Sequence, residues 1–378
     1  MRKHRVLLVV RWPVGGIRTF FRYVYSHFDV RKYEFVLIAP TFAETTLLLN
    51  DLEKLNLQYI PTASNVSDRQ FFYAVIRLIL KDEFDLVHSH GFTAGTCSIL
   101  GSLLKRVPHI ITLHETLTKE RFVGVGGWLK QNILGLTLSM VDAIQCVSED
   151  ARQNLLSYLW ILRNFEWKVI VIEHGIEVGR FLISEARDLR RELGLPPNSF
   201  LIGFLGRYMP EKGFNYLVGA LDLLMKEEGL PRRPVLLSFG QEDGFIREEK
   251  ANVKKMGLSE SVYFLPFVAD VATTLKGLDV VAMPSLHEAC GLLAMEAIVA
   301  GVPLIGTNCI GLREVLRGTV AHAVLARNSH ALSEALLVEM RNPTTARARD
   351  FAREASERFE VRGQAAKLEK LMLKYLER

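Results

Sequence analysis

The sequence predicts an α/β protein made of two doubly wound domains. Short runs rich in β-branched residues alternate with helical patterns along the 378 residues, and this alternation restarts after an interruption at 175–199. Strands that alternate with helices are typical of a parallel sheet covered by helices. The chain is also longer than one ordinary core accommodates, which favours two domains.

The individual elements follow from the same patterns. The first half holds candidate strands at 5–10, 34–39, 86–88, 109–113, 143–147 and 169–172, with helical patterns at 17–27, 70–81, 94–104, 123–139 and 149–158. The second half holds candidate strands at 201–205, 235–239, 262–264, 280–283 and 303–306. We expect one domain at 1–178 and a second at 179–359, with a C-terminal helix at 360–378 packing back on the first.

Composition points to a globular protein in the cytoplasm. Apolar residues make up 49% and charged residues 24% of the chain, as in soluble domains, and no run reaches the roughly 18 apolar residues of a membrane span. The basic N-terminus leads into an apolar run that Arg11 interrupts, which predicts a strand rather than a signal peptide. The four scattered cysteines include no C-x-x-C pair and are expected to be buried thiols.

Charge is uneven along the chain. The first 175 residues hold 20 Lys and Arg against 16 Asp and Glu. Such an excess fits an anionic partner, such as a lipid surface or a phosphorylated acceptor, and equally an ordinary solvated surface. We expect no nucleic-acid partner.

Ligands of doubly wound sheets bind outside the carboxyl ends of the strands, so the residues that follow each strand are the candidates. Gly15 and Gly16 follow the first strand, where glycines let backbone N–H groups approach an anion; a tight turn is the alternative. His114 follows the strand at 109–113 and could hold a hydroxyl or a proton, or serve a structural role. His88 and His90 share one strand face, either as a metal pair or as structural hydrogen-bonding groups.

The segment GRYMPEKG follows the first strand of the second half. It places Arg207 and Lys212 five residues apart on a loop bounded by glycines. A diphosphate spans about this distance and needs cations together with backbone donors. The alternative is a solvated loop with an internal ion pair.

The segment HEACGLLAMEA carries two carboxylates around the start of a predicted helix, Gly291 to Ala300. Glu288 falls in the loop before that helix, where it could meet sugar hydroxyls, and Glu296 lies about a turn and a half inside, where it could reach a ribose. The unpaired amides of the first helical residues are suited to a phosphate: Gly291, Leu292 and Leu293. A helix cap alone would explain the first acid but not the second.

These motifs resemble the retaining GT-B glycosyltransferases of family 4. The matching segments run in the family's order along nearly the whole chain: VGG, ITLHE, CVSED, VIEHGIEVGRF, GRYMPEKG, PSLHEACGLLAMEAIVAGVP and GLREV. The resemblance implies a GT-B fold, in which two Rossmann-like domains face each other across a cleft. It also implies transfer of a hexosyl group with retention, without a metal or other cofactor; consistently, the sequence has no D-x-D.

Residue roles follow from the resemblance. Arg207 and Lys212 would hold the nucleotide diphosphate, Glu288 the transferred sugar and Glu296 the ribose. The backbone from Gly291 would meet the distal phosphate, together with Leu292 and Leu293. Gly15 and Gly16 would approach the phosphates from the first domain, and His114 would face the sugar. The catalytic group expected is Glu288, His114, Arg207 and Lys212, and a UDP-sugar is favoured as donor.

Three positions depart from the family pattern. Cys290 replaces an aromatic residue, His174 stands where Asn is usual, and Glu173 stands where Pro is common. None removes a phosphate ligand, so the departures bear on which sugar is used.

The acceptor is suggested only by indirect features. The apolar segment 121–140 is either an interfacial helix on the inner face of the membrane or a core helix. With the basic first half, it favours a saccharide or lipid-linked acceptor in cell-envelope polysaccharide synthesis.

Four rival functions are weighed against this pattern. A nucleotide-sugar epimerase or a sugar phosphorylase could use the same scaffold, although no cofactor lysine for a phosphorylase is identifiable. A non-catalytic two-lobed binding protein would not need cations beside Glu288. A nicotinamide dehydrogenase would need the G-x-G-x-x-G fingerprint, which the sequence lacks.

Overall fold

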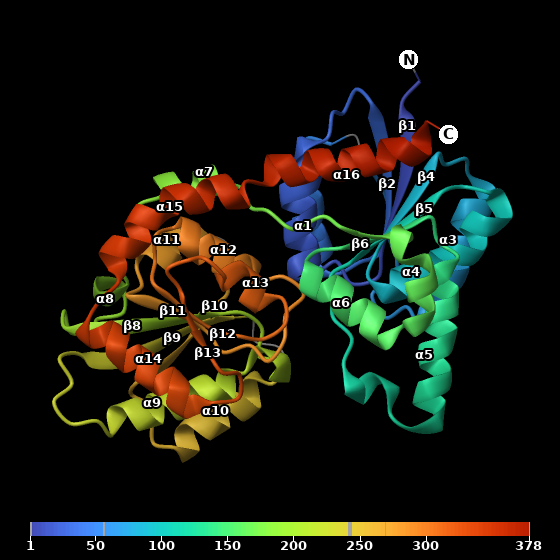
Figure 1. Cartoon of the computed structure of the whole chain (residues 1–378). Helices are drawn as coiled ribbons and strands as arrows, with labels where there is room; N and C mark the ends of the chain where they lie inside the picture. Colours follow the sequence, from blue (N-terminus) through green and yellow to red (C-terminus); the bar gives the residue numbers. More distant parts are fainter. Residues whose placement is uncertain (1, 56, 241–243, 269, 378) are drawn as a thin grey trace. The chain divides into compact units, whose positions relative to one another are not determined.

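The computed structural model describes residues 2–55, 57–240, 244–268 and 270–377 (Figure 1). The chain divides into two compact units. Unit 1 comprises Met1–Gly175 and Val361–Arg378, and unit 2 comprises Ile176–Glu360. The outermost residues of the expected domains, Met1 and Arg378, lie outside the described residues.

Unit 1 is built on a parallel sheet that has seven strands in the described residues, in the order β3-β2-β1-β4-β5-β6-β7. Their bounds are β1 His4–Val10, β2 Tyr33–Pro40, β3 Leu57–Thr62, β4 Leu86–His90, β5 His109–Leu113, β6 Ala143–Cys146 and β7 Val169–Val171. The strands β1, β2, β4, β5 and β6 are almost wholly buried, as expected of a parallel sheet covered on both faces.

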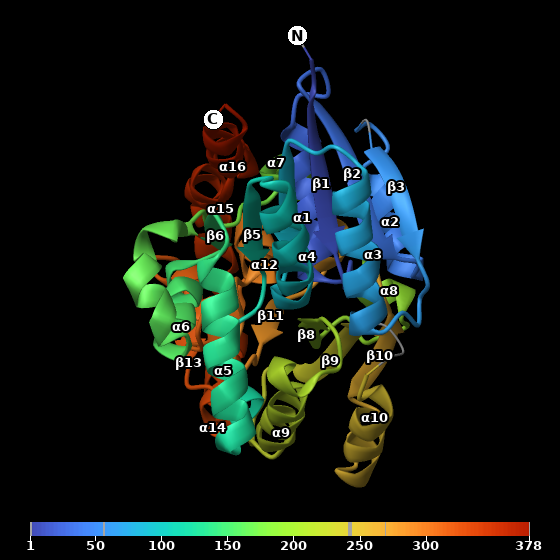
Figure 2. The same ribbon diagram turned by 90° about the vertical axis from the view of Figure 1, so that its right-hand side faces the viewer.

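Helices cover this sheet (Figures 1 and 2). Their bounds are α1 Gly16–Val24, α2 Ala43–Asp51, α3 Asp68–Lys81, α4 Phe92–Lys105, α5 Gly124–Ser139, α6 Glu149–Tyr158 and α16 Val361–Leu376. The C-terminal helix α16 is tied to unit 1 by two tyrosines. Tyr33 donates to Glu369 Oε1 at 3.1 Å, and Tyr375 donates to the carbonyl oxygen of Asp142 at 3.0 Å.

Unit 2 repeats the design with six parallel strands in the described residues, in the order β10-β9-β8-β11-β12-β13. The strands are β8 Ser199–Leu205, β9 Arg233–Gly240, β10 Val262–Pro266, β11 Val280–Met283, β12 Leu304–Thr307 and β13 His322–Val324. The helices are α7 Val178–Ile183, α8 Leu189–Glu192, α9 Phe214–Met225, α10 Ile246–Lys255, α11 Val271–Lys276, α12 Leu292–Val299, α13 Leu312–Leu316, α14 Ser329–Arg341 and α15 Thr345–Phe359.

Every strand expected from the sequence forms, with each end within two residues of its expected position. The structure adds α2, β3 and β13, which the sequence patterns did not indicate. The strand β3, LQYIPT, lies at the sheet edge and carries a proline, and β13 is only three residues long. The expected helix at 17–27 ends at Val24 and continues as a single 3₁₀ turn, Tyr25–His27.

Strand order reverses at one point in each sheet, between β1 and β4 in unit 1 and between β8 and β11 in unit 2. Crevices of doubly wound sheets form at such switch points, outside the carboxyl ends of the strands. The segments after β1, β8 and β11 contain Gly15, GRYMPEKG and HEACG. The motifs singled out in the sequence therefore lie where this fold places ligands.

Candidate active site

In unit 2, two glycines let three loops approach each other at the carboxyl edge of the sheet. Gly213 has φ +66°, and a Cβ there would lie 2.1 Å from the carbonyl oxygen of Pro284, after β11. Gly311 has φ +76°, and a Cβ there would lie 2.3 Å from the carbonyl oxygen of Glu288. Only glycine satisfies both the positive φ and the close approach. The glycines thus hold the segments after β8, β11 and β12 together.

Backbone hydrogen bonds fix these loops further. The N–H of Leu286 donates to the carbonyl oxygen of Glu211 at 2.7 Å, and the N–H of Glu288 donates to that of Ile310 at 3.0 Å. The hydroxyl of Thr307 donates to the carbonyl oxygen of Ser285. Side chains on the three loops therefore have defined positions.

Glu288 and Lys212 form the charged centre of this edge. Lys212 Nζ lies 2.7 Å from Glu288 Oε1, and Ser285 Oγ donates to the same oxygen at 2.8 Å. The side chain of Glu288 is 11% exposed and that of Lys212 is 27% exposed. A carboxylate this buried needs a paired cation. The two predicted residues are brought together across 76 positions of sequence.

Arg207 lies on the same loop as Lys212 but is exposed. Its side chain forms no ion pair or hydrogen bond with any residue that the structure describes. Its guanidinium group is therefore available to an anion at the carboxyl edge of β8, where it could bind bidentately.

The helix α12 begins one residue later than expected, with Gly291 as its N-cap. One of the three expected amide donors is already engaged, because the N–H of Leu292 donates to the carbonyl oxygen of Cys290 at 3.0 Å. The tight bend before the helix causes this, and the prediction of a free Leu292 amide is wrong. Glu296 is buried within α12, at 8% exposure.

In unit 1, Gly15 caps α1 with φ 56° and ψ −127°, a conformation that favours glycine. Gly16 is the first helical residue, and a Cβ there would meet nothing within 4 Å. The helix begins directly after the switch-point strand β1, with open space at its first residue. The predicted glycine turn is therefore present at the expected edge.

His114 lies in a cluster of rings at the carboxyl ends of β4 and β5. Its Nε2 is 3.0 Å from His90 Nδ1, and its ring centroid is 4.9 Å from that of Phe20 and 5.9 Å from that of His174. Burial holds the pKa of His114 well below its ordinary value, with a smaller contribution from neighbouring histidines. The ring is therefore neutral at physiological pH.

Phe20 of α1 and Tyr25 of the following 3₁₀ turn enclose this cluster, which was not predicted from the sequence. The signal available was a pair of alternating histidines on a strand together with aromatic residues five apart on the preceding helix. His88 uses both ring nitrogens in hydrogen bonds, to Tyr25 and Thr112, which fits the structural alternative rather than the metal pair. Among the described residues, no cluster of three or more His, Cys, Asp or Glu is arranged to hold a metal ion.

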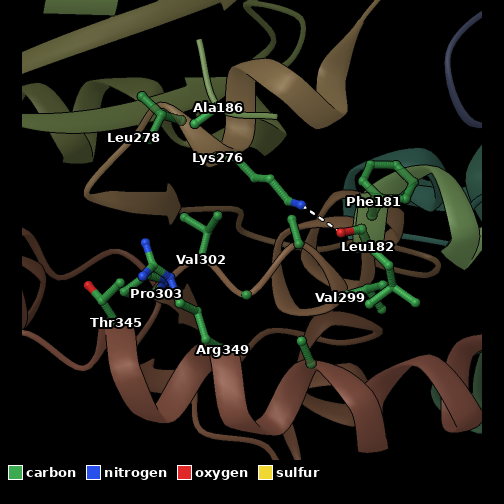
Figure 3. Close-up of a pocket in the computed structure, with 13 residues that line it drawn as sticks. Phe181, Leu182, Ala186, Lys276, Leu278, Val299, Val302, Pro303, Thr345 and Arg349 are labelled. Atoms are coloured by element: carbon green, nitrogen blue, oxygen red, sulfur yellow. Dashed lines mark hydrogen bonds between the residues drawn. The ribbon is translucent and has the colours of Figure 1, made fainter. Parts of the chain in front are cut away.

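A pocket of about 400 Å³ opens elsewhere in unit 2 (Figure 3). Its lining includes Lys276, Leu278, Pro303 and Arg349. Leu278 and Pro303 precede β11 and β12, so the pocket lies at the amino edge of the sheet. The candidate site lies at the opposite, carboxyl edge.

Comparison with known families agrees with this arrangement. The family model described as Glycosyltransferase Family 4 matches residues 14–180. The model described as Glycosyl transferases group 1 matches residues 185–358. The two matches cover nearly all of units 1 and 2.

Individual relatives are glycosyltransferases. The chain is 28% identical to phosphatidyl-myo-inositol mannosyltransferase of Mycobacterium leprae over 87% of this chain and 84% of that protein. It is 29% identical to D-inositol 3-phosphate glycosyltransferase of Actinosynnema mirum, over 64% of this chain and 60% of that protein. The match thus spans less than two thirds of the latter protein's length.

Solved structures show the same fold. Anabaena HepE in complex with UDP and glucose superposes with a TM-score of 0.81 at 20% identity, covering 98% of this chain and all of that one. Sucrose-phosphate synthase from Thermosynechococcus elongatus gives a TM-score of 0.75 at 17% identity, covering 98% and 99%. Two parallel, doubly wound units with this likeness define the GT-B fold class. Together with the two family matches, they show that the chain belongs to the family 4-type glycosyltransferases.

Proposed function

We propose that the protein transfers a hexosyl group from a nucleotide diphosphate sugar to an acceptor hydroxyl, with retention of anomeric configuration. The observation that carries this proposal is the carboxyl edge of unit 2, where the Lys212–Glu288 pair lies on the same set of loops as the exposed Arg207. A diphosphate needs fixed cations and a transferred sugar needs a hydroxyl-binding carboxylate. UDP is the favoured nucleotide, because the HepE structures contain UDP and UDP-glucose.

The chemistry follows from charge development. As the glycosidic bond breaks, negative charge accumulates on the outer phosphate, and Arg207 and Lys212 stabilise it in the transition state. Glu288, positioned by Lys212 and Ser285, binds hydroxyls of the sugar. Glu296 binds the ribose, and the Gly291 and Leu293 amides bind the phosphate. The reaction uses no metal or other cofactor.

Retention requires attack on the face from which the nucleotide leaves. The leaving phosphate accepts the proton of the acceptor hydroxyl, so no protein carboxylate becomes glycosylated. Mass spectrometry of protein quenched during turnover should show no sugar attached to Glu288. A glycosylated Glu288 peptide would contradict this route.

The first test is a thermal-shift panel with UDP, GDP, ADP and their sugars. A nucleotide that binds only the folded chain raises its melting temperature by mass action. We expect one nucleotide series to stabilise the protein, Arg207→Ala to lose that stabilisation, and Lys254→Ala, an exposed cation on α10, to retain it. A panel in which no nucleotide stabilises the wild-type chain would contradict the proposal.

Product analysis separates the rival reactions. With the stabilising nucleotide sugar and a saccharide acceptor, we expect nucleoside diphosphate release and a product whose anomeric proton shows the donor's configuration by NMR. An epimerase would convert the donor without releasing nucleotide, and a phosphorylase would require inorganic phosphate. An inverted product would contradict retention.

We also propose that unit 1 rests on an anionic membrane surface while it uses a lipid-linked acceptor. The helix α5, on the outside of unit 1 in Figure 2, exposes an apolar face. Five of its large side chains are over half exposed: Val125 86%, Trp128 61%, Leu129 53%, Ile133 55% and Leu136 54%. Lys130 on α5 and Lys119 on the 3₁₀ turn before the helix are both exposed. Apolar area together with cations binds anionic interfaces.

No described helix has the length and apolar character needed to cross a bilayer, so the proposed contact is interfacial. We expect the wild-type chain to sediment with vesicles containing phosphatidylglycerol and Ile133→Glu to remain in solution. Val338→Glu, on an exposed position of α14, should still sediment. Equal sedimentation of both variants, or self-association through α5 in velocity sedimentation, would contradict membrane docking.

A further inference from the structure

A continuous chain of hydrogen bonds runs through the buried sheet of unit 1 and ends at His114. It links side chains of β6, β5, β4 and the turn after α1: Gln145, Thr112, His88, Tyr25, His90 and His114. The first five of these residues are at most 1% exposed. Water therefore does not compete for these bonds, and the direction of each one can be worked out from its donors and acceptors.

The series of hydrogen bonds begins at the backbone carbonyl oxygen of Ile172, which can only accept. Gln145 Nε2 lies 3.3 Å from the carbonyl oxygen of Ile172, which requires the amide N–H₂ at this end. Gln145 Oε1 therefore faces Thr112, whose hydroxyl donates to it at 2.7 Å. The flipped amide would set two oxygens against each other, so the orientation is fixed by the backbone.

The direction then passes to His88. Because the single proton of the Thr112 hydroxyl is used by Gln145, His88 Nε2 must donate to Thr112 Oγ1 at 2.7 Å. Burial lowers the pKa of His88 to about 3, so the ring is neutral and its Nδ1 can only accept. Tyr25 donates to that nitrogen at 2.8 Å.

The same logic carries the direction to His114. Tyr25 has used its proton on His88, so its oxygen accepts from His90 Nε2 at 3.1 Å. His90 is also neutral, since burial holds its pKa well below the ordinary value, and its Nδ1 accepts from His114 Nε2 at 3.0 Å. His114 is therefore the Nε2–H tautomer.

The remaining nitrogen of His114 is left as an acceptor. Its Nδ1 is buried and has no hydrogen-bond partner among the described residues. A buried acceptor without a donor is unfavourable, and a ligand that donates a hydrogen bond to it removes this cost.

We propose that this series of hydrogen bonds, through Tyr25 and His90 as positioning residues, holds His114 in the Nε2–H tautomer. The Nδ1 of His114 then accepts a hydrogen bond from a hydroxyl of the bound saccharide. The opposite tautomer would carry its proton on Nδ1, which could then not accept a hydrogen bond from a hydroxyl. The identity of that hydroxyl as part of a saccharide rests on the proposed function, whereas the tautomer does not.

The test is ¹⁵N NMR of histidine rings in the full chain without ligand. Wild-type His88, His90 and His114 should each show a protonated Nε2 and an unprotonated Nδ1. Tyr25→Phe removes the hydrogen bonds that join His88 to His90, so His90 and His114 should become mixtures of tautomers. His109, whose Nε2 pairs with Ser89 and takes no part in this series of hydrogen bonds, should not change.

Tyr33→Phe is the matched control, because Tyr33 is also a fully buried tyrosine of unit 1 and its hydroxyl pairs with Glu369 instead. It should leave the tautomers unchanged. A second pair tests the anchor: Thr112→Val should disorder the tautomers, and Thr112→Ser, which keeps the hydroxyl, should preserve them.

Activity gives an independent readout. Relative to Tyr33→Phe, Tyr25→Phe should lower kcat/KM by about tenfold, the cost of one uncharged hydrogen bond to substrate. An Nδ1–H His114 in the wild type, or unchanged tautomers in Tyr25→Phe, would overturn the inference. If the tautomers behave as expected but the protein uses no nucleotide sugar as donor, the proposed function fails. The inference that Tyr25 and His90 set the tautomer of His114 would then still hold.

Discussion

The two units of this protein present different chemistry at corresponding edges of similar sheets. In unit 2, the loops after β8 and β11 hold an ion pair, Lys212 with Glu288, beside an exposed arginine. In unit 1, the ends of β4 and β5 hold neutral rings joined by directed hydrogen bonds. Fixed charges suit a diphosphate, whereas neutral acceptors suit hydroxyl groups. Under the proposed function, the sheet edge of unit 2 would bind the diphosphate and that of unit 1 a hydroxyl group.

The largest expected difference between the units is in their response to acid. Burial depresses the pKa of four histidines that are at most 6% exposed, His88, His90, His109 and His174, three of them to about 3. All four lie in unit 1.

The unfolded chain binds protons below about pH 6.5, whereas the folded rings of His88, His109 and His174 remain neutral down to about pH 3. The folded His90 ring likewise stays neutral well below its ordinary pKa. The contribution of these histidines to the free energy of unfolding is therefore fully present above pH 6.5. It falls as the pH decreases through this window, by up to about 1.4 kcal/mol per pH unit for each histidine. Hydrogen exchange of the full chain at pH 7 and pH 5, corrected for intrinsic rates, should show unit 1 losing protection first. Earlier loss in unit 2 would contradict the comparison.

The next largest effect is expected from removing the cation of the unit 2 ion pair. Lys212→Ala deletes the charge that we propose stabilises the leaving phosphate, and it leaves Glu288 without its partner cation. We expect kcat to fall by about 10²–10³, the usual cost of one preorganised transition-state contact. Lys254→Ala should retain wild-type kcat, and steady-state rates of nucleotide release measure both variants. A Lys212→Ala enzyme with normal kcat would show that the charge does not act in the reaction.

A smaller effect should come from the glycine that brings the unit 2 loops together. Gly213→Ala meets both a positive φ and a carbonyl oxygen at 2.1 Å, so it should destabilise the fold by about 2–4 kcal/mol. Gly257 has φ +72° with nothing within 4 Å of its Cβ position, so Gly257→Ala should cost only about 1 kcal/mol. Urea unfolding of both variants checks the difference, and equal midpoints would show that the close approach is not what requires glycine.

The sequence predicted the sheets well because their strands are buried runs of β-branched residues, and such runs are visible without tertiary information. It missed β3, whose alternating residues end in Pro61 and Thr62 at a sheet edge, and β13, which is too short to form a pattern. It also missed α2, which lies between β2 and β3 in the chain and buries only two of its residues.

The candidate site was predicted in part. Glu288 and Lys212 lie in recognisable motifs, and their placement after β11 and β8 follows from the strand pattern. Their direct contact depends on loops held together by Gly213 and Gly311, which no local pattern reveals. The Leu292 amide was predicted to be free because the bend at Cys290 was not visible in the sequence.

The series of hydrogen bonds that ends at His114 in unit 1 was the least predictable feature. It joins Tyr25 to His88 and His90 across more than 60 residues, and its direction is set by the backbone carbonyl of Ile172. Histidine spacing on β4 placed two rings on one face, but the donors and acceptors around them come from other elements.

The most direct test of this division of chemistry is calorimetric binding of the nucleoside diphosphate that the thermal-shift panel selects. We expect Lys212→Ala to weaken its affinity by at least about tenfold, as expected for a lost charge-assisted contact, and Tyr25→Phe to bind it as tightly as the wild type. If Tyr25→Phe weakened binding as much as Lys212→Ala, or if Lys212→Ala bound normally, the assignment of charge recognition to unit 2 and hydroxyl recognition to unit 1 would be wrong.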